Sequence, residues 1–179
     1  MTEREISSDR PRSANFRAAN ILGALSLLIQ DRVESAWLSA LDLSPMAVAA
    51  LVQIDNEPGS SIEQVASRIG LTHSATVRVI DKLSERGFVE KDRARQDARA
   101  QSLKLKKAGK RTVQQLHAAR NQVTDDLLAG LDPAQREALE DAIGAILHRT
   151  VEPGREADVT CRVCDDRRCS PDICPIRLV

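Results

Sequence analysis

The composition of this 179-residue chain is that of a globular protein, 42% apolar and 29% charged, and its single Trp, two Phe and absent Tyr argue against the aromatic stacking platforms of single-strand and RNA modules. The formal net charge is zero, yet residues 71–110 hold eleven Lys and Arg against five Asp and Glu, a net charge of +6. Such segregation of charge is typical of a phosphate-binding surface.

The N-terminal part of the chain shows neither a signal peptide nor a membrane span. Residues 1–13 are polar and are expected to be disordered. The longest apolar stretch, from Ile21 to Ile29, is too short to cross a bilayer and is interrupted by Gly23 and Ser26. We therefore expect a cytoplasmic protein with no membrane partner.

A long amphipathic helix is predicted within residues 14–43, because apolar residues recur at helical spacing from Ile21 to Leu41. Ser44-Pro45 is a helix start signal, with Ser as the N-cap and Pro in the first turn. It predicts a second helix, which residues 56–59 (Asn-Glu-Pro-Gly) end.

Residues 60–87 have the spacing of a helix-turn-helix. Ser60-Ser61-Ile62-Glu63 fits a capping box at the start of a third helix, which runs to Gly70. After a tight turn, a fourth helix begins near His73 and ends at Gly87, where a left-handed residue is favoured. A short helix, a tight turn and a longer helix are the parts of this DNA-binding motif.

A β-hairpin, or wing, is predicted next. Residues 88–91 and 101–105 read as two short strands around a polar, Arg-rich connection over residues 92–100. Gly109 is expected to break the pattern. Two further helices are predicted within residues 110–150, the second one capped by Asp132-Pro133. The expected fold class is mainly α (α+β), a winged helix-turn-helix over residues 44–109 with a two-stranded wing.

The fourth helix and the wing carry the candidate DNA-binding residues. A helical wheel places Thr76, Val79, Ile80 and Leu83 on a packing side. The outer side carries Ser74, Val77, Arg78 and Asp81. Arg suits guanine edges and a Val methyl suits the thymine methyl, while the positive helix start suits a phosphate. Asp81 is expected to pair with an Arg of the wing. The candidate residues are Thr72, His73, Ser74, Val77, Arg78, Lys82, Arg93, Arg95 and Arg99.

Several short runs resemble the MarR family of regulators: Leu71-Thr72, residues 79–83 (Val-Ile-Asp-Lys-Leu), residues 86–89 (Arg-Gly-Phe-Val) and the wing motif Asp97-Ala98-Arg99. The resemblance covers about residues 15–150. Ala98 and Lys106 depart from the family pattern, where Arg and Thr are common, which affects details of the wing.

The resemblance implies a bacterial, nucleoid-associated homodimer, with residues 14–43 and 110–150 forming its dimerisation region and Asp97 holding the wing. It further implies binding of double-stranded DNA at a pseudo-palindromic operator, as a repressor, with two recognition helices in successive major grooves. A small-molecule effector is a further implied partner, in a pocket between the dimer helices and the winged domain.

All four cysteines lie in residues 151–179, as Cys161-x2-Cys164-x4-Cys169-x4-Cys174. A reducing cytoplasm disfavours disulfides, so the cluster points to a bound metal, with tetrahedral zinc as the first expectation. An iron–sulfur cluster and a reversible dithiol remain alternatives, and either would make the tail a sensor coupled to DNA binding.

Two other functions compete with DNA binding. An enzyme is not expected, because His73, His117 and His148 lie in separate predicted helices without a neighbouring nucleophile. A winged helix used only for protein contact would bind no DNA, whereas a DNA-binding regulator should lose affinity as salt rises.

Overall fold

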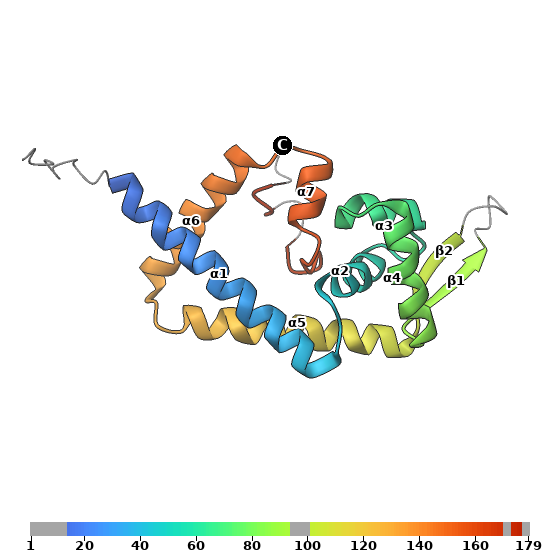
Figure 1. Cartoon of the computed structure of the whole chain (residues 1–179). Coiled ribbons are helices and arrows are strands. Elements are labelled where there is room, and N and C mark those ends of the chain that lie inside the picture. Colours follow the sequence, from blue (N-terminus) through green and yellow to red (C-terminus); the bar gives the residue numbers. More distant parts are fainter. Residues whose placement is uncertain (1–13, 94–100, 170–172, 177–179) are drawn as a thin grey trace, which may run out of the picture.

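The computed structural model describes residues 14–93, 101–169 and 173–176, and its elements form two groups (Figure 1). One group consists of the long helices α1 (Ala14–Leu41), α5 (Lys107–Leu128) and α6 (Pro133–Thr150). The other consists of α2 (Pro45–Asn56), α3 (Ile62–Ile69), α4 (His73–Glu85) and the strands β1 (Val89–Arg93) and β2 (Gln101–Leu105). The short helix α7 (Arg155–Thr160) lies between α6 and α3 (Figure 1). The predicted class, a mainly helical winged helix-turn-helix, is confirmed; the expected disorder of residues 1–13 lies outside the described residues.

Most predicted helix boundaries coincide with observed caps. The Ser44 hydroxyl accepts a hydrogen bond from the amide of Ala47 (3.3 Å), and Pro45 stands in the first turn of α2. Gly70 ends α3 with φ 72°, and Gly87 follows α4 with φ 76°. Both are left-handed conformations that residues with a Cβ adopt only at a cost.

The predicted capping box is wrong by one residue. The N-cap of α3 is Ser61, whose partner is Gln64, not Ser60 with Glu63. Ser60 is 3% exposed and donates its hydroxyl to the Glu57 carbonyl (2.7 Å), so its side chain closes the preceding turn instead. Either of the two consecutive serines could have served as the N-cap. Because Ser60 is buried, Ser61 takes that role.

The two strands form an antiparallel ribbon in which Val89 pairs with Leu105. Backbone hydrogen bonds also tie β2 to the loop between α2 and α3: Gly59 donates to the Leu103 carbonyl (2.8 Å), and Leu103 donates to the Ser60 carbonyl (2.9 Å). The base of the wing is therefore fixed to the helix-turn-helix on one side.

The sequence predicted that Gly109 breaks the helical pattern, and this prediction is wrong. Gly109 lies inside α5. It is buried, and a Cβ built on it would stand 2.2 Å from the carbonyl oxygen of Phe88. The glycine permits α5 to approach the backbone just before β1. Its role is close packing, which a local sequence pattern does not distinguish from a helix break.

The core sits around α2, and α6 takes almost no part in it. The largest fully buried side chains come from α2, α4, β2 and α5, and include Leu51, Ile54, Ile80, Leu83, Leu103 and Leu116. Trp37 of α1 is buried, and its Nε1 donates to the Leu116 carbonyl (3.1 Å), which fastens α1 to α5. No residue of α6 is buried within the chain.

No single helix in the described ranges has the length and apolar character to cross a membrane, and only the pair α1 and α2, bent by 81°, passes that test together.

Candidate nucleic-acid interface

Helix α4 is anchored by its inner side and leaves its first turn open to solvent. Thr76, Ile80 and Leu83 are buried against the core, as the helical wheel predicted. Thr72 caps the helix by accepting from the amide of Ala75 (3.3 Å), and its hydroxyl stands 3.4 Å from that of Ser74. The start of α4 therefore presents backbone amides and hydroxyls to whatever approaches it.

Four of the predicted contact residues on α4 are exposed, namely His73, Ser74, Arg78 and Lys82. Val77 differs, because it is half-buried and packs against the core. It precedes Ile80 by one turn, so it shares the edge of the buried stripe. Val77 can present only part of its side chain outward.

The carboxylate of Asp81 is paired with Lys91 of strand β1. The expected partner was an arginine of the wing, and that detail is wrong: the partner is a lysine on the strand itself. The contact neutralises the one acidic side chain in the middle of α4 and links that helix to the wing.

The predicted DNA-contact residues of the wing lie largely outside the described part of the structure. Arg93 is the last residue of β1, but its side chain, and the predicted contact residues Arg95 and Arg99 with Asp97, lie outside the described part of the structure. Lys104 on β2 stands 3.4 Å from Asp92 on β1, so the strands carry paired charges.

A groove of about 410 Å³ lies between the α1–α2 junction and α4. Arg86 spans one end of it, donating to the carbonyls of Leu41 (3.0 Å) and Asp42 (2.8 Å) while its guanidinium lies 5.2 Å from the centre of the Phe88 ring. The sequence analysis missed Arg86, whose backbone partners are more than forty residues away and leave no local pattern. The groove is lined by Asp42, Leu43, Ser44, Ala47, Arg78, Val79, Lys82, Leu83, Glu85 and Arg86.

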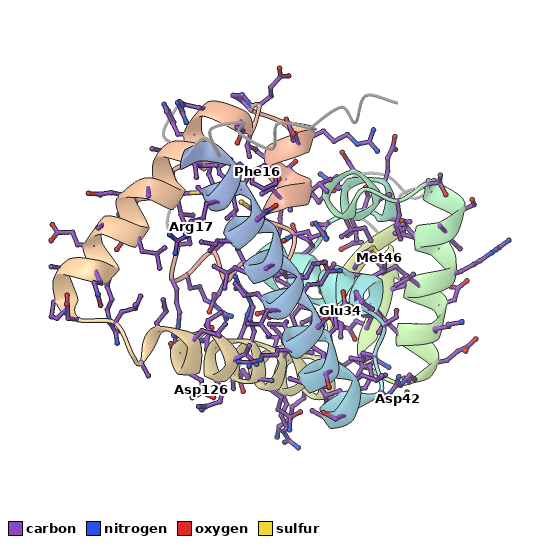
Figure 2. The ribbon with its side chains drawn as sticks, turned by 60° about the vertical axis from the view of Figure 1, so that its left-hand side comes forward. Phe16, Arg17, Glu34, Asp42, Met46 and Asp126 are labelled. Carbon is purple, nitrogen blue, oxygen red and sulfur yellow. The ribbon has the colours of Figure 1, made fainter. Side chains whose placement is uncertain are left out.

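Helices α1 and α6 expose large apolar side chains that the other described residues leave uncovered. Figure 2 shows α1 from its outer side, with Phe16 at the end nearest α6 and α7. Such side chains are normally buried, and a patch of them marks a contact with another molecule. Its members on the two helices are Phe16, Ile21, Leu22, Leu27, Leu28, Leu38, Ile143 and Ile146.

The cysteine tail folds back onto the protein. Cys161 and Cys174 are buried with Ala157 and Ile176, and Cys164 and Cys169 pack partly buried against the same small cluster. None of the four forms a disulfide. Across residues 14–93, 101–169 and 173–176, no three Cys, His, Asp or Glu side chains form, as they stand, a group able to hold a metal ion.

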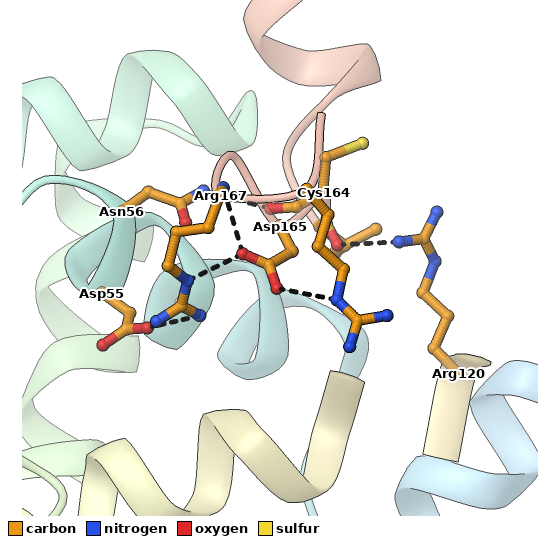
Figure 3. A network of polar contacts seen from close by, with 8 residues as sticks. Asp55, Asn56, Arg120, Cys164, Asp165 and Arg167 are labelled. Carbon is orange, nitrogen blue, oxygen red and sulfur yellow. Dashed lines mark hydrogen bonds and ion pairs between the residues drawn. The ribbon is translucent and has the colours of Figure 1, made fainter. Parts of the chain in front are cut away.

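A polar network holds the tail against α2 and α5 (Figure 3). Asn56 donates to the Cys164 carbonyl (3.1 Å) and Arg120 to the Val163 carbonyl (3.4 Å). Arg167 bridges Asp165 (2.8 Å) and Asp55 (3.2 Å). The sequence analysis found none of these contacts, and all but the Arg167–Asp165 pair join segments more than forty residues apart.

The thiols and one imidazole in this region have shifted pKa values. A hydrogen bond from Cys161, helped by Arg120, lowers the pKa of Cys164 to about 6 against the opposing effect of burial. Burial and the neighbouring Cys174 raise the pKa of Cys169 to about 11. His117 has its pKa lowered mainly by burial, and its Nε2 has no hydrogen-bond partner among the described residues.

Comparison with known proteins agrees with this arrangement. Residues 41–100 match the sequence model of the MarR family. RV1404 from Mycobacterium tuberculosis superposes with a TM-score of 0.69 at 20% identity, over 81% of this chain and 99% of that one. A MarR-family transcriptional regulator from Rhodococcus sp. RHA1 gives 0.59 at 20% identity, over 76% and 96%. Wild-type MarR from E. coli gives 0.59 at 22% identity, over 70% and 96%.

The described elements form a winged helix-turn-helix in which the first turn of α4 is open to solvent. That domain is similar to the winged helix-turn-helix of MarR-family proteins.

Proposed function

We propose that the chain is a transcriptional repressor that binds double-stranded DNA as a homodimer, with the α4 helices of the two chains in successive major grooves of a pseudo-palindromic operator on the bacterial nucleoid. The observation that carries the proposal is the outer face of α4, where Ser74, Arg78 and Lys82 are exposed beyond a capped helix start. The neutralised Asp81 leaves this face without an unpaired acidic group at its centre.

The side chains on this face suit separate tasks. The amides at the start of α4, with Thr72 and His73, suit a phosphate oxygen. Arg78, one turn further along, suits the O6 and N7 acceptors of guanine, and Lys82 suits the backbone. The +6 charge of residues 71–110 supports association with the DNA polyanion.

Dimerisation through α1 and α6 is supported by what these helices leave uncovered. The α6 helix buries no residue within its own chain, and its exposed Ile143 and Ile146 are matched by the exposed leucines of α1. A second copy of the chain would remove this surface from water and present α4 twice. The resulting symmetry is the one that a palindromic site requires.

The groove beside α4 supports control by a small-molecule effector. It lies between the end of α1 and the DNA-facing helix, and Arg78 belongs to both the groove and the proposed contact face. An anion bound beside Arg78, Lys82 and Arg86 would compete with DNA for the same cations and would relieve repression.

The test uses the gene's own upstream region as a labelled duplex. Fluorescence anisotropy should show tight binding by the wild-type protein and a loss of about 1–3 kcal/mol for Arg78→Ala, the typical value of a base contact. Arg149→Ala, on exposed α6, removes the same charge far from α4 and should bind like the wild type. Equal binding by all three proteins would show that Arg78 makes no base contact, whereas no binding by any of them would favour a winged helix that contacts only proteins.

A further inference from the structure

The cysteine tail has an interior made largely of sulfur. Cys161 and Cys174 are 7% and 3% exposed, and Ala157 and Ile176 are their buried neighbours in that cluster. Leu147 and Val151 add only partial cover. A cluster this small cannot hold some twenty-five residues in place by apolar burial alone, and chains in this position commonly use disulfides or a metal.

The four cysteines gather in one small cluster. Cys161 and Cys174 are its buried members, and Cys164 and Cys169 pack against it, partly buried. The amide of Cys164 donates to the Cys161 carbonyl (2.8 Å), so these two residues belong to one tight turn.

We propose that Cys161, Cys164, Cys169 and Cys174 together bind one zinc ion as four thiolates. Zn–S bonds of about 2.3 Å in a tetrahedron separate neighbouring sulfurs by about 3.8 Å. Because the four cysteines already share one small cluster, short movements of the tail would bring their sulfurs to this spacing. The ion replaces the thiol protons and draws the cysteines together, so its binding energy becomes folding energy for the tail.

A cationic side chain lies beside one of the four thiols. The Arg120 side chain lies beside Cys164 and donates to the adjacent Val163 carbonyl. Asp165, the nearest carboxylate in the sequence, is held by Arg167 and Arg168. Four thiolates around a divalent ion carry a net charge of −2, which Arg120 offsets in part.

The ion would fasten the tail to the helix-turn-helix. Gln53 donates to the Arg162 carbonyl (3.1 Å) and Asn56 to the Cys164 carbonyl (3.1 Å), so the Cys161–Cys164 turn sits directly on α2. Val159 of α7 lies against Gly70, the first residue of the turn between α3 and α4. A Cβ added at Gly70 would stand 3.2 Å from the Val159 side chain. Zinc binding therefore stabilises the segment that orients α4, a consequence that rests on the proposed DNA-binding function although the metal site does not.

The full-length protein, purified without oxygen and without a metal-affinity tag, should contain about one zinc per chain. Substitution with cobalt should give the sulfur-to-metal charge-transfer and d–d bands of a tetrahedral thiolate site. Cys169→Ser should lose the zinc. Cys169→His, which restores a zinc ligand at the same place, should recover it, and Thr160→Ala, an exposed neighbour of Cys161, should keep it.

Trypsin provides a second readout that does not depend on DNA. Arg162, Arg167 and Arg168 should resist cleavage in the zinc-loaded protein and be cut rapidly after chelation, with protection restored by added zinc. Iron with a visible absorption band, a metal-free protein with four reactive thiols, or a pair of disulfides would each overturn the zinc site. Loss of DNA binding with the zinc intact would count only against the proposed function.

Discussion

Asp81 of α4 and Lys91 of β1 form an ion pair, and this contact joins the proposed recognition helix to the wing. Both side chains are partly exposed, so the pair contributes little to stability. A double-mutant cycle of Asp81→Asn and Lys91→Met should give a coupling free energy of unfolding of about 0.2–1 kcal/mol in urea titrations. Strictly additive single-mutant effects would show that the two side chains do not interact in solution.

Gly109→Ala should destabilise the protein strongly. The new Cβ would meet the Phe88 carbonyl oxygen at 2.2 Å; the backbone fixes the position of the Cβ and the oxygen belongs to the backbone, so neither can rotate away. We expect a loss of about 1–3 kcal/mol or more in the free energy of unfolding, as for other overpacked sites. Gly130→Ala is the matched control, because nothing lies within 4 Å of its Cβ position, and its effect should stay within about 0.5 kcal/mol.

The burial of His117 should make stability depend on pH. Burial lowers its pKa in the folded protein, whereas the unfolded chain keeps an ordinary value of about 6.5. The unfolded state therefore binds a proton first, and stability should be lost as the pH falls from about 6.5 toward the lower folded pKa. Asp55, Asp165, Arg120 and Arg167 are the charged groups that act on this imidazole.

His117→Leu removes that proton site without breaking a described hydrogen bond of Nε2. Denaturant titrations between pH 7.5 and 5 should show a flatter pH dependence in this variant than in the wild type. His73→Gln, at an exposed position on α4, should retain the wild-type slope. An unchanged slope in His117→Leu would assign the pH dependence to other groups.

A charge placed on the apolar surface of α1 and α6 should separate the proposed dimer. Ile21 and Ile143 are 56% and 39% exposed in the single chain, and a glutamate at either position would be buried by a partner. Ile21→Glu and Ile143→Glu should sediment as monomers at concentrations where the wild type is a dimer. Ser35→Glu introduces the same charge on α1 at an exposed polar position and should remain dimeric; a monomeric wild type would remove the basis of this prediction.

Much of the winged domain could be predicted from the sequence because its signals are local. The Ser44-Pro45 cap, the left-handed Gly70 and Gly87, and the buried stripe of Thr76, Ile80 and Leu83 all follow from short-range geometry. Such local features predict the order of the helices around α4 and most of their boundaries without any tertiary contact.

The role of Gly109 and the docking of the tail were missed because they depend on contacts between distant segments. Gly109 resembled a helix break because nothing in its neighbourhood shows that Phe88 lies against it. The cysteine spacing predicted a cluster, but the docking of the tail through Asn56 and Arg120 joins residues far apart in the chain. Pairings of this kind leave no periodicity in the sequence.

The central claim is that a dimer presents the cationic face of α4 and the wing twice to duplex DNA. It is tested most directly by titrating a duplex from the gene's upstream region across a range of salt concentrations while measuring the number of bound chains. We predict two chains per operator and a logarithmic affinity that falls linearly with the logarithm of salt, with a slope of about −0.9 for each phosphate contact. Single chains on the duplex, or no binding at low salt, would contradict the account.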